Sequence, residues 1–168
     1  MADLTKTALL RRIRCWLILF IVGLVLSGLT AFPLQLELLW LNHFLGVATT
    51  APLAPEPELH VWLRRVYEGL AQTNRRYPFL AYGTDWLAFA HLAIAVAFLG
   101  PLRDPVRNRW VLTFGVIACF GVVLLALIAG AVRGIPFYWR LIDCCFGVFG
   151  AIPLLACLRY VGLLERQG

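Results

Sequence analysis

The stretch WVLTFGVIACFGVVLLALIAGAV, residues Trp110–Val132, contains no charged side chain. The hydrocarbon core of a bilayer is about 30 Å thick, and a helix rising about 1.5 Å per residue crosses it with roughly 20 residues. The stretch is therefore long enough to span a membrane. Because its backbone amides would find no other hydrogen-bond partner in lipid, we expect it to be an α-helix.

Three more stretches are apolar over a similar length. They lie at about residues 15–32, 84–102 and 141–163. The first has no charged side chain, whereas the second contains Asp85 and His91 and the third contains Asp143 and Arg159. Together with Trp110–Val132 they predict an all-α integral membrane protein. We expect a four-transmembrane-helix bundle in which residues 1–168 form a single membrane domain.

The composition agrees with this fold class. Hydrophobic residues make up 61% of the 168 residues, charged residues make up 14%, and the mean hydropathy is +0.81. Soluble domains are nearer to half apolar and a quarter charged, so an ordinary soluble domain, a disordered tail and a disulfide-rich secreted module are excluded. In a soluble protein the net charge of +6 would suggest a nucleic-acid partner. Here the arginines flank apolar stretches, so we expect a lipid bilayer as the partner and no nucleic acid.

The basic residues also predict an orientation, because short loops rich in Lys and Arg stay in the cytoplasm. With the N-terminus inside, most of the 15 Lys and Arg residues lie in the inner segments. The inner ones are Lys6, Arg11, Arg12, Arg14, Arg103, Arg107, Arg109, Arg159 and Arg166. We expect a bacterial-type inner membrane, cytoplasmic termini and an extracytoplasmic loop over residues 33–83. Arginines before residues 15–32 also fit a signal peptide, but Leu29-Thr30-Ala31 is a poor cleavage site, so we expect the helix to be retained.

The loop over residues 33–83 is too long for a simple connection, and we expect it to form a subdomain. Three prolines interrupt it within Thr49–Pro57. After this break apolar residues recur with helical spacing, which predicts an amphipathic helix with Pro57 at its start. These residues are Leu59, Trp62, Leu63, Val66, Tyr67 and Leu70. Before the break, residues 34–45 are apolar with polar interruptions, and this pattern does not separate a helix from a strand.

Five ionisable residues are predicted to lie in the outer third of the membrane. They are Asp85, His91, Arg133, Arg140 and Asp143. Charged groups at this depth usually face the interior of a helical protein, where they pair with one another or serve a function. Small residues share their helical faces, among them Gly130, Gly147 and Gly150, and would let neighbouring helices approach closely. The five residues are our candidate ligand-binding pocket, open to the outer side.

A purely structural network explains the same residues. Arg140 and Asp143 stand three positions apart on one helix and would neutralise each other. Arg133 would extend to the lipid headgroups, and Asp85 would favour the start of its helix through the helix dipole. His91 would donate a hydrogen bond to a neighbouring carbonyl. At the level of the sequence both interpretations stay open.

His91 is the one histidine within a predicted span, so it is the residue that would bind a haem iron or a metal ion. No HxxxH or ExxH spacing supports it, and we assign neither a metal site nor catalytic residues. Five cysteines also fall within predicted spans, where we expect them to be packing residues. They are Cys15, Cys119, Cys144, Cys145 and Cys157.

These features favour a small polytopic membrane protein that is a ligand-binding or accessory subunit. Stripes of small residues and the GxxxG spacing of Gly130 and Gly134 are typical of helices that pack against another membrane protein or a second copy. The alternative is a membrane enzyme or a proton-coupled transporter that uses the same histidine, aspartates and arginines for proton transfer.

Overall fold

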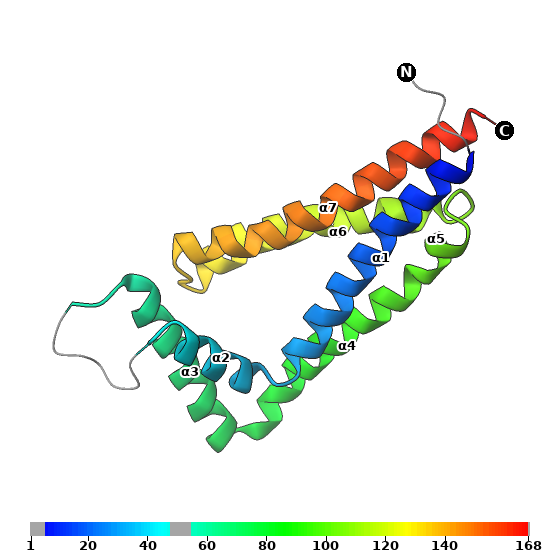
Figure 1. Ribbon diagram of the computed structural model, residues 1–168. Helices are drawn as coiled ribbons and strands as arrows, with labels where there is room; N and C mark the ends of the chain where they lie inside the picture. The colour runs from blue at the N-terminus through cyan, green and yellow to red at the C-terminus, as the bar shows by residue number, and fades with distance from the viewer. Residues whose placement is uncertain (1–5, 48–54, 168) are drawn as a thin grey trace. The chain divides into compact units, whose positions relative to one another are not determined.

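The computed structural model describes residues 6–47 and 55–167, which are helical and contain no strand (Figure 1). In chain order the elements are α1 (Lys6–Ala31), α2 (Leu34–Phe44), α3 (Glu58–Arg76), the 3-10 helix η1 (Pro78–Ala81), α4 (Tyr82–Ala97), α5 (Leu99–Arg103), α6 (Arg109–Val132) and α7 (Phe137–Glu165). The predicted all-α class is thus confirmed for these residues. Within the proline-rich break at Thr49–Pro57, residues 49–54 lie outside the described residues.

Four helical segments are long and apolar enough to cross a membrane. They are Lys6–Ala31, Pro78–Arg103, Arg109–Val132 and Phe137–Glu165. Large apolar side chains remain exposed along them, such as Trp110 at 71%, Leu125 at 66% and Phe149 at 68%. Apolar surface of this extent on long helices is what lipid chains cover in a membrane protein. The four predicted spans are therefore confirmed as helices of spanning length and composition.

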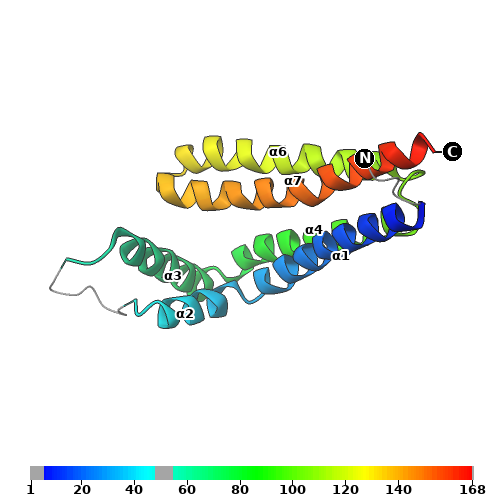
Figure 2. The same cartoon turned by 45° about the horizontal axis from the view of Figure 1, so that its top comes forward.

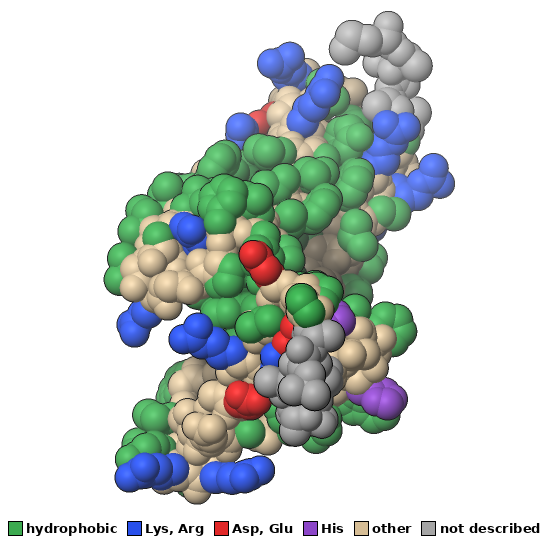
Figure 3. Space-filling view, turned by 90° about the vertical axis from the view of Figure 1, so that its left-hand side faces the viewer, with side chains coloured by type: hydrophobic (Ala, Val, Ile, Leu, Met, Phe, Trp, Pro, Cys, Tyr) green, Lys and Arg blue, Asp and Glu red, His purple; other side chains and the backbone are tan. Residues whose placement is uncertain are grey.

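The chain divides into two compact units, whose borders fall within α1 and α4. The first unit combines the chain up to Leu24 with the chain from Ile94 onward, and the second unit is Val25–Ala93. In the first unit, basic side chains gather at the end where the two termini lie, and apolar side chains cover the helices beyond them (Figure 3). Such a distribution is typical of arginines that flank spanning helices.

The core of the first unit draws on α1, α6 and α7 and on Phe98, which lies between α4 and α5. Its fully buried side chains are Leu9, Ile13, Leu17, Phe98, Leu112, Leu154, Cys157 and Val161. The rings of Phe20 and Phe98 pack with their centroids 4.7 Å apart. The Cys157 thiol lies 3.6 Å from the carbonyl oxygen of Ile13, which joins α7 to α1.

Helices α6 and α7 form an antiparallel hairpin in which small residues allow a close approach (Figures 1 and 2). A Cβ atom on Gly147 would lie only 2.5 Å from the carbonyl oxygen of Cys119. A Cβ atom on Gly115 would lie 2.7 Å from Leu154 Cδ1. At Gly147 the neighbouring atom belongs to the backbone, so no larger side chain fits unless the helices move apart, and the predicted role of the small-residue face is confirmed there.

The second unit contains the hairpin of α2 and α3, which lie side by side in both ribbon views (Figures 1 and 2). Its buried apolar residues include Leu38 of α2 and Leu63 and Ala71 of α3. The predicted amphipathic helix is confirmed as α3, which begins directly after Pro57. Residues 34–45, for which the sequence left helix and strand open, form α2.

Both glycines with a positive φ angle close a helix. Gly46 (φ 68°) follows α2 and Gly134 (φ 69°) follows α6. After α6, the Ile135 amide donates to the Gly130 carbonyl and the Gly134 amide donates to the Ala131 carbonyl, which is the bonding pattern of a Schellman motif. Gly134 is therefore a helix cap, and the GxxxG spacing at 130–134 is not a helix-contact motif here.

Candidate functional site

The five predicted pocket residues fall into two groups, one in each unit. Asp85 and His91 lie on α4 in the second unit. Arg133 follows the last residue of α6, and Arg140 and Asp143 lie on α7 in the first unit. The geometry within each unit shows what each side chain contacts.

His91 is half-buried, and its Nδ1 lies 2.8 Å from the carbonyl oxygen of Leu87, one turn earlier on α4. A carbonyl oxygen only accepts hydrogen bonds, so Nδ1 carries the proton and donates it. In the neutral ring the other nitrogen, Nε2, has a free lone pair and can accept a proton or bind a ligand. The hydrogen bond expected from a structural network is present, and it leaves one nitrogen of His91 available.

Asp85 lies in the first turn of α4. A carboxylate at that place is stabilised by the positive end of the helix dipole, as the structural interpretation of the sequence expects. Thr84 beside it donates a hydrogen bond of 2.6 Å to the carbonyl of Ala81. Asp85 therefore has a role in stabilising the helix start without any ligand.

Arg140 of α7 lies along the end of α6. Its Nη1 donates to the Leu127 carbonyl at 3.3 Å, and its guanidinium carbon lies 5.3 Å from the ring centroid of Phe137. Gly130 makes room for this arrangement, because a Cβ there would lie 2.7 Å from Arg140 Cδ. A positive charge at the carboxyl end of a helix is favourable. Arg140 thus joins the two helices of the hairpin.

Asp143 of α7 does not pair with Arg140. Among the described residues it forms neither a hydrogen bond nor an ion pair, so the neutralising contact with Arg140 that the sequence suggested is not formed. Asp143 is half-buried, and it lies one turn before Gly147, which packs against α6. Its carboxyl group therefore lies beside the seam of the hairpin with its hydrogen-bonding capacity unused.

Arg133 is exposed at the end of α6. Within the described part of the chain it forms no ion pair. An exposed arginine at the end of a spanning helix is free to extend toward lipid headgroups, as expected. It has no contact that would place it in a binding site of the first unit.

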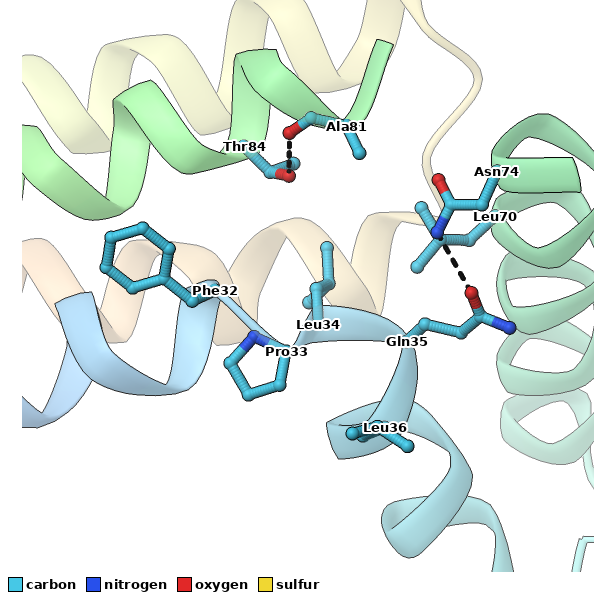
Figure 4. Close-up of a pocket in the computed structure, with 9 residues that line it drawn as sticks. All are labelled: Phe32, Pro33, Leu34, Gln35, Leu36, Leu70, Asn74, Ala81 and Thr84. Carbon is cyan, nitrogen blue, oxygen red and sulfur yellow. Dashed lines mark hydrogen bonds between the residues drawn. The ribbon is translucent and has the colours of Figure 1, made fainter. Parts of the chain in front are cut away.

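A cavity in the second unit was not expected from the sequence (Figure 4). It has a volume of about 100 Å³ and lies where the ends of α1 and α3 approach the starts of α2 and α4. Its lining residues are Phe32, Pro33, Leu34, Gln35, Leu36, Leu70, Asn74, Ala81 and Thr84. Asn74 Nδ2 donates to Gln35 Oε1 at 2.9 Å, while Asn74 Oδ1 is buried with no partner among the described residues. A water molecule in the cavity would satisfy this oxygen.

One ion pair lies outside the spanning segments of the second unit. Arg64 of α3 contacts Glu56, which stands before the helix, through both guanidinium nitrogens Nη1 and Nη2. This contact lowers the pKa of the Glu56 carboxyl from its ordinary value and raises the pKa of Arg64. The periodic pattern of apolar residues predicted α3 but gave no sign of this ion pair.

The described residues contain no cluster of three or more His, Cys, Asp and Glu side chains that could hold a metal ion. His91 Nε2 is the nitrogen with which this chain would bind a haem iron or a metal from α4. Comparisons with protein families, with curated proteins and with solved structures find no match to the chain.

Proposed function

We propose that this protein is a ligand-binding or accessory subunit of the membrane and that Asp143 contacts the ligand or the partner. The observation that supports this role is the half-buried Asp143 carboxyl on a spanning helix, unpaired among the described residues. Its neighbour Arg140 is bound to the end of α6 instead. The carboxyl group is thus available to a group from outside the chain.

An unpaired carboxyl group at the position of Asp143 lowers the stability of the protein. The aromatic residues Phe137, Tyr138 and Trp139 open α7, and such residues favour the membrane–water interface. Asp143 follows them by one turn or more, which is about 6–9 Å further along the helix. A carboxyl group at that depth costs stability unless it is protonated or paired. Binding of a ligand or a partner protein by the carboxyl group would offset this loss of stability.

The chemistry of the carboxyl group limits what it binds. A carboxylate accepts hydrogen bonds and attracts positive charge, whereas its protonated form also donates one hydrogen bond. We therefore propose a ligand or partner side chain with a cationic or N–H donor group. The apolar walls of the hairpin would select for a molecule that dissolves in the membrane.

His91 supports a second candidate function. Its Nε2 is the nitrogen that does not bond to Leu87, on a half-buried imidazole of a spanning helix, and an imidazole nitrogen can accept and return a proton. A membrane enzyme or a proton-coupled transporter would use it as a proton acceptor. In that case loss of His91 abolishes turnover or flux and leaves ligand affinity intact.

The orientation stays part of the proposal. We propose cytoplasmic termini and an extracytoplasmic segment between α1 and α4 in a bacterial-type inner membrane. The distribution of arginines supports it, because more of them flank the termini and the α5–α6 connection than the opposite ends of the spans.

The test compares Asp143→Leu and Asp143→Asn with wild-type protein extracted from its membrane in mild detergent. Native mass spectrometry reports any bound mass, and the absorption spectrum reports any haem. We expect wild-type protein to carry an additional mass and Asp143→Leu to lose it without a lower unfolding temperature, because Leu removes an unpaired polar group. Asp85→Asn is the matched control and should keep the bound mass.

The outcome is decisive in both directions. An Asp143→Leu variant that keeps the additional mass contradicts the role of Asp143. The role is also contradicted if the wild-type protein has only its bare chain mass, or a simple multiple of it, and Asp143→Leu forms the same species. Loss of the mass in Asp143→Leu with retention in Asp143→Asn assigns the contact to hydrogen bonding, and loss in both assigns it to charge.

A further inference from the structure

The junction of α3 and α4 changes from basic to aromatic within a few residues. Arg75 and Arg76 form the last turn of α3 and are exposed. The chain then continues through Tyr77, Phe79 and Tyr82, whose side chains are 43%, 70% and 61% exposed. Large exposed aromatic side chains beside exposed arginines indicate a surface that is adapted to both water and lipid.

The two arginines are not used by the chain itself as ion-pair partners. Neither Arg75 nor Arg76 forms an ion pair with a described residue, whereas Arg64 on the same helix is held by Glu56. Residues 69–84 contain no acidic side chain. The guanidinium carbon of Arg76 lies 5.4 Å from the ring centroid of Tyr77, a cation–π contact that leaves the N–H groups of the guanidinium open.

The depth of this junction follows from what comes next. The segment Pro78–Arg103 is apolar enough to span a membrane, so its first residues lie where the hydrocarbon ends. Aromatic rings favour that level, and arginines directly before it reach the phosphate groups of the lipids. Trp86, one turn into α4 and 57% exposed, packs edge-on against Tyr82 and Phe89 and extends the aromatic surface inward.

We propose that Arg75 and Arg76 form a binding site for the phosphate-bearing headgroup of an anionic membrane lipid, with Tyr77, Phe79 and Tyr82 against its glycerol and acyl chains. A guanidinium group donates paired hydrogen bonds to phosphate oxygens, which matches this headgroup. Two unpaired positive charges favour a lipid with net negative charge over a zwitterionic lipid. The aromatic residues anchor the lipid chains and restrict the site to a membrane-bound phosphate.

The other role for these arginines is local. Positive side chains in the last turn of a helix are stabilised by the helix dipole, with no ligand required. This role would make Arg75 and Arg76 matter for the stability of α3 and leave lipid preference unchanged. The two roles therefore predict different measurements.

The experiment uses the full chain in mild detergent, titrated with phosphatidylglycerol or phosphatidylcholine and analysed by native mass spectrometry. We expect tighter binding of phosphatidylglycerol. Arg75→Gln and Arg76→Gln should each weaken that binding about fivefold, the equivalent of about 1 kcal/mol per arginine. Phosphatidylcholine binding should stay unchanged. Arg65→Gln is the matched control, because Arg65 is exposed on the same helix and loses the same charge.

Three results would overturn the proposal. The first is an equal loss of phosphatidylglycerol binding in Arg65→Gln, which would assign the effect to net charge. The second is unchanged binding in both Arg75→Gln and Arg76→Gln. The third is full displacement of the lipid by excess glycerol 3-phosphate, which would make a free phosphate compound the ligand. If the variants do not fold, as judged by circular dichroism, the wild-type protein decides: its phosphatidylglycerol binding should weaken between 50 and 500 mM salt, and salt-independent binding contradicts the site.

Discussion

The two helical hairpins of this chain are stabilised by different interactions. In α6–α7 the backbones approach at Gly147, and few polar side chains take part along the middle of the helices. In α2–α3 the helices keep side chains between them, with buried Leu63 and a hydrogen bond from Asn74 to Gln35. The ion pair of Arg64 with Glu56 adds a polar contact at the start of α3.

This difference shows two ways in which a helix pair is held together. Lipid chains are as apolar as leucine, so burying a leucine between two spanning helices gains little, and close packing of small residues becomes the main attraction. Helix α3 instead carries charged residues opposite an apolar face, and that face packs against α2 through side chains such as Leu63. One hairpin is thus held by a glycine at a close backbone contact and the other by a buried leucine between its helices.

The largest effect is expected from Leu63→Ala. The Leu63 side chain is 1% exposed, and its truncation leaves a cavity between α2 and α3. We expect the second unit to lose about 3 kcal/mol of unfolding free energy, within the range for a buried leucine. Denaturant titration in detergent, followed by tryptophan fluorescence, measures it. Val61→Ala is the control, since Val61 is 45% exposed on the same helix and should change stability by less than about 0.5 kcal/mol. Equal effects of the two variants would show that α3 does not use this apolar face.

The next effect tests α6–α7. In Gly147→Ala the new Cβ would lie 2.5 Å from the Cys119 carbonyl oxygen and 3.0 Å from Val123 Cγ2, so the helices must separate. We expect a loss of about 2 kcal/mol, as for other overpacked sites. Gly121→Ala is the matched control on α6, where nothing lies within 4 Å, and it should gain up to about 1 kcal/mol from the better helix propensity of alanine. Thermal unfolding in detergent compares the two, and a gain at both positions would contradict close backbone packing.

The smallest effect concerns pH. The contact with Arg64 lowers the pKa of Glu56 below its ordinary value of 4.5, so the folded state favours the ionised carboxylate. The stabilisation is therefore fully present above about pH 4.5 and is lost as the pH falls through the lowered pKa. We expect the start of α3 to become more susceptible to proteolysis by pepsin as the pH falls below 4.5. Glu56→Gln should remove this dependence, and Glu68→Gln, on the exposed face of α3, should keep it. A wild-type profile that matches Glu56→Gln would contradict the contribution of the ion pair.

Much of the fold follows from hydropathy. The charge-free stretch Trp110–Val132 predicts α6 to within one residue, since nothing polar competes with its helix. The second span was predicted as continuous over residues 84–102, but the helix is interrupted between Ala97 and Leu99. Pro101 explains this difference, because it has no N–H group to donate to the Ala97 carbonyl and its ring crowds that turn. Helix α1 begins at Lys6, earlier than its apolar stretch, because the arginine-bearing residues continue the same helix.

The candidate site was predictable only in part. The sequence identifies His91 and Asp143 because ionisable residues are rare in apolar stretches. Spacing alone paired Arg140 with Asp143, whereas the structure shows Arg140 against Leu127 through the space left by Gly130. A contact between two helices depends on their rotation about their axes, which the sequence of one helix does not fix. The same reason hid the cavity beside Asn74, since its lining comes from several elements.

The contact of Ile13 with Cys157 has a consequence for how the protein is made. These residues are 144 positions apart, so the buried face of α1, with Leu9 and Leu17, has core partners in α7, which is synthesised much later. Helices α6 and α7, joined by a short turn at Gly134, can pair as soon as both have entered the membrane. Helix α1 therefore completes its packing only after α7 has been made, and until then part of its inner face is open to lipid or to another protein.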